Sequence, residues 1–397
     1  MDSFARTDSG WQIGNHFKSS CEEERMKKVL LLLTALCVLG SPAMAEDVVK
    51  IGLMGPMTGS WASEGQEMKQ VVELLAEDLN AKGGVMGKKV EVITEDDAGD
   101  PRTAALASQR LITQGVVAVV GTYGSSVTEA TQNIYDEAGI IQIANGSTAI
   151  RLTAKGLKHF FRTCPRDDEQ GKVGAQTIQD MGFKKVAILH DNTTYAKGLA
   201  DETKALLEKM EGVEIVFFEA LTPGEQDYNA ILTKMKGSEP DVVFFTGYYG
   251  EAGLLLRQKK EMNWDVPFIG GDATNNPDLV KVAGKDAAAG FHFLSAPLPK
   301  DLPSEAAKNF LKQFGEKYGN PPSSIYSVLA GDGFRVIAKA IADTQSTDTE
   351  TLAAYLKNDL KGFPGLTGEI SFSPSGDRVG EAYRVYKVDE EGNFILQ

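Results

Sequence analysis

Short apolar runs alternate along this chain with longer segments in which apolar residues recur every three or four positions. The short runs are typical of buried strands, and the longer segments of amphipathic helices. The expected strands are 49–54, 89–94, 116–120, 140–143, 185–190, 213–218, 241–246, 267–270 and 290–294. The expected helices are 67–81, 101–114, 127–138, 170–181, 199–210, 228–235 and 251–261. This alternation predicts an α/β fold with doubly wound parallel sheets.

The regular alternation of strands and helices ends after residue 294. Helices dominate residues 304–360, and two strands follow near 369–372 and 383–388. The late helices need a sheet to cover, and the simplest solution returns the chain to the first lobe. We therefore expect two lobes joined by a hinge of three segments. Lobe 1 would comprise residues 46–165 and 296–386, and lobe 2 residues 166–295 and 387–397.

The segment 26–45 reads as an export signal, with a basic start, an apolar core and Ala43–Met44–Ala45 at its end. Its apolar run is shorter than the roughly 20 residues that span a bilayer. Residues 1–25 precede a second methionine and are excluded from the fold together with the signal. Cys37 does not fit a lipid-attachment signal, because Leu36 before it is too bulky. We expect a periplasmic protein cleaved after residue 45.

Charge and cysteine content narrow the possible functions. The net charge of −14 argues against binding nucleic acid or an anionic membrane surface. Cys164 is the only cysteine beyond the expected signal, so no intrachain disulfide is expected. A chain of 397 residues is too long for a single core, which agrees with two lobes.

Hydroxyl residues follow two neighbouring apolar runs, at Ser125 and at Ser147–Thr148. They would lie past the carboxyl ends of two parallel strands, where open α/β sheets bind ligands. Ser125 also stands where a helix should begin, so free backbone amides would point to the same place. Neutral donors around a helix start suit a small carboxylate. Because no nucleophile–base pair is visible beside them, we expect binding more than catalysis.

Five motifs resemble a known family. They are KIGLMGPMTG at 50–59, DLNAKGGVMG at 78–87, DDAGDP at 96–101, LHDNTTYAKGLA at 189–200 and FTGYYGE at 245–251. In this order they resemble the branched-chain amino-acid-binding proteins of bacterial ABC transporters. The resemblance implies a type I periplasmic binding fold, a ligand between the lobes, a membrane permease as partner and a monomeric receptor.

The resemblance also implies site residues. Ser125 would hold the ligand α-carboxylate, and Gly146 and Thr148 would contact the carboxylate and the ammonium. Asp272 would pair with the ammonium, while Tyr195 and Tyr248 would close over the ligand from the second lobe. Each position has a plainer alternative: a helix cap for Ser125 and Asp272, a turn for Gly146 and Thr148, and core packing for the two tyrosines.

The chain departs from the family pattern beside these positions. Glu64 stands where the family usually has an aromatic residue, and Trp61 is three places earlier. A carboxylate in the side-chain pocket would disfavour leucine-like ligands and favour polar or basic ones; alternatively, Glu64 is solvated. Gly99 and Gly124 stand where family members carry a disulfide.

Two further aromatic residues, Tyr123 and Tyr326, are additional wall candidates. Ser147, between Gly146 and Thr148, is expected to point elsewhere.

Other site types find no support in the sequence. No phosphate-binding glycine motif appears, the histidines lack metal-ligand spacing, and no nucleophile elbow is present. We expect neither a cofactor nor a metal. Two rival functions remain: a binding or sensing protein for an aromatic acid or amide, and an exported enzyme on the same scaffold.

Overall fold

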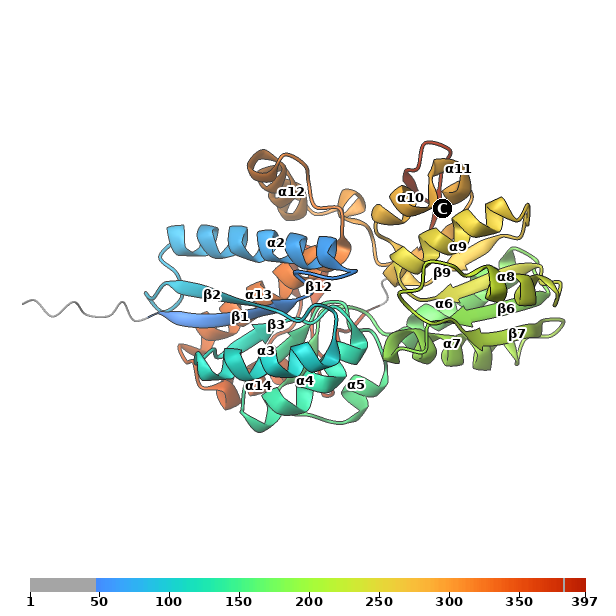
Figure 1. The fold of residues 1–397 in the computed structure, drawn as a ribbon. Helices are drawn as coiled ribbons and strands as arrows, with labels where there is room; N and C mark the ends of the chain where they lie inside the picture. The colour runs from blue at the N-terminus through green and yellow to red at the C-terminus, as the bar shows by residue number, and fades with distance from the viewer. Residues whose placement is uncertain (1–47, 381–382) are drawn as a thin grey trace, which may run out of the picture. The chain divides into compact units, whose positions relative to one another are not determined.

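The computed structural model describes residues 48–380 and 383–397 (Figure 1). Residues Val48–Gln397 form one compact unit. The expected export signal, including Cys37, lies outside the described residues. Within the described ranges, no helix combines the length and apolar character needed to cross a membrane.

The first sheet is entirely parallel, with strand order β2-β1-β3-β4-β5. Its strands are β1 (Val49–Gly55), β2 (Val90–Asp96), β3 (Ala118–Val120), β4 (Ile141–Ala144) and β5 (Phe160–Arg162). The crossover helices are α2 (Ala62–Ala81), α3 (Pro101–Thr113), α4 (Ser125–Glu137) and α5 (Arg151–Ala154). Figure 1 shows α2 and α3 on opposite faces of this sheet, as a doubly wound fold requires.

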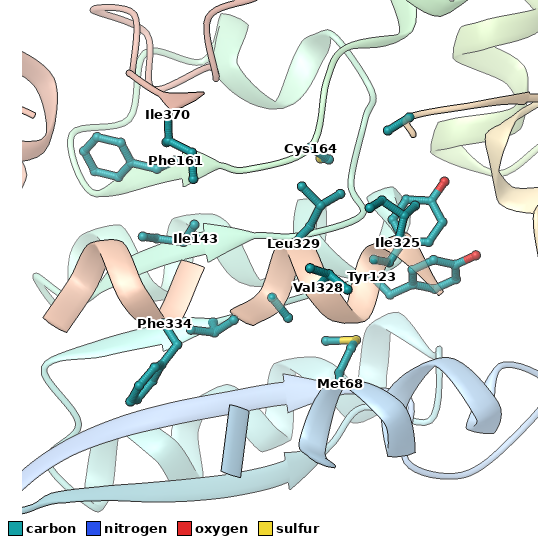
Figure 2. Packing of buried hydrophobic residues seen from close by; sticks show 14 of the residues in the cluster. Met68, Tyr123, Ile143, Phe161, Cys164, Ile325, Val328, Leu329, Phe334 and Ile370 are labelled. Atoms are coloured by element: carbon teal, nitrogen blue, oxygen red, sulfur yellow. The ribbon is translucent and has the colours of Figure 1, made fainter. Parts of the chain in front are cut away.

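The late helices return to the first sheet, as expected. They are α12 (Glu305–Tyr318), α13 (Ile325–Thr344) and α14 (Thr349–Asn358), followed by the hairpin of β11 (Phe363–Gly365) and β12 (Gly368–Ile370). Helix α13 packs against α2 and against β3 and β4. Figure 2 shows its residues Val328 and Leu329 in one apolar cluster with Met68 of α2 and Ile143 of β4.

The second sheet has strand order β14-β13-β10-β9-β8-β6-β7. Its strands are β6 (Lys185–His190), β7 (Glu214–Ala220), β8 (Val242–Thr246), β9 (Phe268–Gly270), β10 (His292–Ser295), β13 (Arg384–Val388) and β14 (Phe394–Leu396). Its helices are α6 (Asp167–Asp180), α7 (Thr194–Leu207), α8 (Asn229–Lys236), α9 (Tyr249–Glu261), α10 (Asp278–Ala283) and α11 (Lys285–Ala288), with short 3₁₀ turns η1 (Asp272–Thr274) and η2 (Pro299–Asp301). Strand β13 runs antiparallel to both of its neighbours, β10 and β14.

The chain therefore crosses between the sheets three times, after β5, after β10 and before β13. The expected α/β fold with two doubly wound lobes is confirmed. One boundary is wrong: β13 starts at Arg384 and pairs with β10, so residues 384–386 belong to the second sheet. The pairing of β13 is decided across the molecule, by register with β10, and local sequence does not encode it.

Candidate ligand-binding site

Helix α4 begins at Ser125, directly after the loop that follows β3. Its N-cap is Gly124, which offers no side chain to the first amides of the helix. The alternative that Ser125 is the cap is therefore wrong. Its buried hydroxyl accepts a hydrogen bond of 3.2 Å from the amide of Ala149, in the next strand-end loop. A helix start without a side-chain cap leaves its amides and its partial positive charge available to an anion.

Thr148 lies in that second loop, and Arg162 of β5 holds the loop in place through hydrogen bonds. The Arg162 guanidinium is fully buried and donates to the carbonyl oxygens of Ser147 and Ala149, at 3.0 and 2.9 Å. The hydroxyl of Thr148 is buried beside the Asp167 carboxyl but makes no well-formed hydrogen bond within the described chain. A rigid loop thus presents an unsatisfied polar group, which is what a ligand contact requires.

Ser147 points away from this group, as expected. Its hydroxyl donates to the carbonyl of Thr122 at 2.9 Å and lies 2.7 Å from the hydroxyl of Thr128. Gly146 is close-packed, because a Cβ there would lie 2.7 Å from Cδ2 of Tyr123 and 3.2 Å from Cδ1 of Tyr326. Only glycine lets these two rings approach the loop.

Asp272 reaches the same region from the second sheet. It follows β9, and 3 % of its surface is exposed. The N-cap of η1 is Gly271, so the alternative of Asp272 as a helix cap is wrong. Its Oδ2 accepts from the Tyr383 hydroxyl at 3.1 Å, and the hydroxyls of Tyr195 and Tyr326 also bond to it. Burial raises the pKa of Asp272 despite these hydrogen bonds.

A second buried carboxyl, Asp167, was missed in the sequence. It is the first residue of α6, and its pKa is raised well above the usual value by burial and next by the charge of Asp272. Gln170 joins the two acids: its Nε2 donates to Asp167 Oδ1 and to the Tyr383 hydroxyl, each at 3.1 Å, and its Oε1 accepts from the Asp272 amide at 2.7 Å. The acidic run 167–169 gave only the weak signal of an ordinary helix start.

Five aromatic rings form one connected cluster beside Gly146 and Asp272. Tyr123 lies 5.0 Å from Tyr326, 5.6 Å from Trp61 and 6.0 Å from Tyr248, measured between ring centroids. Tyr195 lies 5.5 Å from Tyr248. All these contacts lie in the range of favourable aromatic pairs. Figure 2 shows Tyr123 beside Ile325 at one end of the core cluster.

Trp61 rests on Gly99 and Gly124, the two positions for which the sequence resemblance implied a disulfide in family members. A Cβ at Gly99 would lie 2.7 Å from its indole ring, and one at Gly124 would lie 2.9 Å from it. The indole also stacks on Tyr248, with ring centroids 4.1 Å apart. The indole therefore packs in the space that side chains at Gly99 and Gly124 would need.

Glu64 is fully buried, so the alternative of a solvated carboxylate is wrong. Its Oε1 accepts from Asn276 Nδ2 at 2.7 Å, and its Oε2 from the Ser324 hydroxyl at 2.5 Å. Burial raises its pKa to about 7, with a smaller contribution from the charges of Glu67 and Asp278 and against the lowering effect of these two hydrogen bonds. Neither Asn276 nor Ser324 was picked out in the sequence, since each meets Glu64 only through the fold.

Polar contacts hold the two lobes together at the rim. The amide of Thr194 on α7 donates to the Ser126 hydroxyl at 2.9 Å, and its hydroxyl donates to Glu129 on α4 at 2.9 Å. Tyr249 on α9 donates to the carbonyl of Ser60 at 2.9 Å. The structure is thus a closed form, in which second-lobe residues lie against the first-lobe loops.

The sequence from residue 48 to 393 matches the family model described as periplasmic binding protein. The chain belongs to the periplasmic binding protein family. Among the relatives of this periplasmic binding protein is an amino acid binding protein of Pseudomonas aeruginosa, 35 % identical over 371 residues, which are 93 % of this chain and 97 % of the relative. Leu/Ile/Val-binding protein homolog 1 of Brucella abortus is 35 % identical over 94 % of this chain and all of the relative.

Solved structures agree with the fold of this periplasmic binding protein. A leucine-binding protein from Thermotoga maritima superposes with a TM-score of 0.81 at 29 % identity, over 88 % of this chain and 97 % of the other. A branched-chain amino-acid substrate-binding protein from Streptococcus pneumoniae, solved with isoleucine, has a TM-score of 0.80 at 31 % identity, over 88 % and 99 %. The expected family and its type I fold are confirmed.

Proposed function

We propose that this periplasmic binding protein is the receptor of an ABC importer and holds one amino acid between its lobes. The names of its relatives support an amino-acid ligand. The observation that carries the proposal is the pairing of an uncapped helix start with buried acids. The start of α4 suits an α-carboxylate, and Asp272 with Asp167 suits an α-ammonium.

Five of the predicted residues have a role in this proposal. The Ser125 amide and hydroxyl bind the carboxylate, and the Thr148 hydroxyl can donate to the carboxylate or accept from the ammonium. Asp272 neutralises the ammonium. Neither buried acid forms an ion pair within the described residues, although the charge of Arg162 acts on Asp167. Burying two acids in this way costs free energy, and an incoming ammonium offsets that cost. Tyr195 and Tyr248 then cover the ligand from the second lobe.

Ligand binding must favour the closed form over the open one. Moving a receptor from 1 % to 99 % closed requires about 5.5 kcal/mol of differential affinity. Charge-assisted hydrogen bonds to both ends of an amino acid, made only when the lobes meet, can supply an energy of this size. We propose that the closed receptor, exported by cleavage of its signal and working as a monomer, then docks on the membrane permease. No chemical step is assigned to the site.

Calorimetric titration of the refolded, ligand-free receptor tests the proposal. The twenty amino acids are compared with benzoate, which represents the rival aromatic-acid ligands. We expect binding of at least one amino acid and none of benzoate, because a plain carboxylate leaves Asp272 and Asp167 unpaired. Binding of benzoate with no heat from any amino acid would overturn the proposal.

A further inference from the structure

We propose that the bound amino acid carries a hydrogen-bond donor in its side chain, and that Glu64 and Tyr123 together recognise this donor. The inference rests on the proposed function, because it concerns the part of the same site beyond the α-carboxylate and α-ammonium. It separates this receptor from one built for purely aliphatic side chains.

Glu64 is a buried acid whose acceptor capacity is only partly used. A carboxylate offers about four lone-pair directions, and Glu64 receives one neutral donor at each oxygen, from Asn276 and Ser324. The charges that act on it are the acidic side chains of Glu67 and Asp278, and no ion pair to Glu64 occurs in the described part of the chain. A donor brought by a ligand would supply what the protein does not.

Tyr123 carries the second unsatisfied group. Its hydroxyl is buried and has no hydrogen-bond partner among residues 48–380 and 383–397. The charges of Glu64 and Asp272 both act on this hydroxyl. Tyr123 also lies against Gly146, in the loop proposed to contact the carboxylate and the ammonium. On its other side its ring lies 5.0 Å from that of Tyr326, whose amide donates to the same Ser324 hydroxyl that donates to Glu64.

The remaining walls are the rings of Trp61 and Tyr248, which stack on each other beside Tyr123. A leucine side chain would leave both the Tyr123 hydroxyl and the free acceptor positions of Glu64 dry and unpaired. Sites built around a buried hydrogen-bonding group reject analogues that lack the partner.

Three arms of a calorimetric titration test the inference on the full mature receptor after refolding. The aliphatic arm uses leucine, isoleucine and valine; the neutral-donor arm uses threonine and glutamine; the cationic arm uses lysine and arginine. We expect a ligand from one of the two donor arms to bind at least about tenfold tighter than leucine. Near pH 6 a cationic ligand should release more protons than a neutral-donor ligand, because its side-chain charge favours the ionised Glu64, whereas the α-ammonium acts on Asp272 and Asp167 with every amino acid.

Two variants test which residue causes the preference for a donor-bearing ligand over leucine. Tyr123→Phe should cut the donor-over-leucine preference about tenfold while leucine binding stays level or improves. Glu64→Gln should weaken the cationic arm more than the neutral arm. Tyr135→Phe is the matched control, because it removes a buried hydroxyl that contacts Met54 away from the pocket, and it should leave the preference unchanged.

The outcomes separate the inference from the proposed function. Leucine binding as tightly as every donor ligand, or an unchanged preference in Tyr123→Phe, overturns the inference while amino-acid binding stands. If Glu64 serves only to tie the lobes together, Glu64→Gln should weaken the binding of all amino acids equally. That result would also overturn the inference. Absence of binding by any amino acid removes the proposed function and this inference with it.

Discussion

The indole of Trp61 lies against the phenol ring of Tyr248, with ring centroids 4.1 Å apart and planes inclined by 29°. Trp61 is the N-cap of α2, over the first sheet, and Tyr248 is the N-cap of α9, over the second. The stack therefore joins residues from the two lobes. Aromatic pairs contribute about 0.5–1.5 kcal/mol beyond the area that they bury, so this pair favours the closed form.

Adding a side chain at Gly124, against which the indole packs, should loosen this stack. In Gly124→Ala the new methyl would lie 2.9 Å from the indole, so the ring must shift. Ligand affinity should fall by up to about tenfold, which corresponds to about 1 kcal/mol. Gly198→Ala is the matched control, because its Cβ meets nothing within 4 Å in the middle of α7. Calorimetry on both variants checks the difference. Equal affinities would show that the position of Trp61 does not matter for closure.

Removing the charge of Asp272 should abolish most of the amino-acid binding. Asp272→Asn keeps the shape and loses the charge-assisted bond to the ammonium, for an expected loss of about 3 kcal/mol, or about a hundredfold in affinity. Titration calorimetry measures the loss. A melting curve in the absence of ligand checks the fold, and the melting temperature should not fall, because Asp272 forms no ion pair within residues 48–380 and 383–397. Unchanged affinity would place the ammonium elsewhere.

Glu64 should make the ligand-free protein less stable as the pH rises. Its pKa is raised from 4.5 to about 7, so the folded protein holds this proton more tightly than the unfolded chain does. The stabilisation is full below about pH 4.5 and is lost as the pH rises through about 7. Glu64→Gln should therefore raise the free energy of unfolding at pH 8, by at most about 3 kcal/mol.

Urea unfolding at pH 5 and pH 8 measures this effect. Asp97, with a pKa raised to about 7, and Asp191, raised to about 6, titrate in the same range. Parent and variant both carry Asp97 and Asp191, so the difference between their stabilities reports on Glu64 alone. Glu261→Gln, at an exposed helix end, is the control and should show no such difference. A variant with the same pH dependence as the parent contradicts the prediction.

Breaking the ion pair of Arg162 should destabilise the fold strongly. Arg162 is fully buried, and its Nε donates to Asp377 Oδ1 at 2.7 Å. Asp377→Ala leaves this guanidinium without its counterion, and we expect a loss of about 3–5 kcal/mol in the free energy of unfolding. The pair also lowers the pKa of Asp377, so its stabilisation is present above about pH 4 and lost as the pH falls further.

Chemical denaturation at pH 7 compares this variant with Asp201→Ala. Asp201 pairs with Lys197 one turn away on the exposed face of α7, and such a pair contributes at most about 0.5 kcal/mol. A loss in Asp377→Ala no larger than in Asp201→Ala would show that the buried pair contributes little. Because Arg162 also holds the carbonyls around Thr148, surviving protein should bind ligand more weakly.

Some elements were predictable from sequence and others were not. The strand β6 begins and ends at the predicted residues, since its apolar run is long and clearly bounded. Strands β5 and β14 were missed, because each has three residues and no periodic pattern to detect. Strand β11 was missed for the same reason, and Pro364 within it argues locally against a strand.

The residues of the candidate site also divide into those that local sequence predicts and those that it does not. Ser125 and Thr148 were predictable because strand-end hydroxyls next to a helix start need only local pattern. Asp167, Gln170 and Tyr383 were not, although they complete the acidic part of the site. Gln170 and Tyr383 are 213 residues apart along the chain, and their hydrogen bond exists only after the last crossing returns beside α6.

By itself the sequence determined the alternation of strands and helices and the two lobes, and it predicted hydroxyl residues at the strand ends of the first lobe, because these follow from patterns over neighbouring residues. Only the tertiary structure decided that Glu64 is buried against Asn276 and Ser324, and that Trp61 lies on Gly99 and Gly124. The physical reason is that burial and desolvation are properties of what packs around a group. For both residues, those neighbours lie far away in the chain.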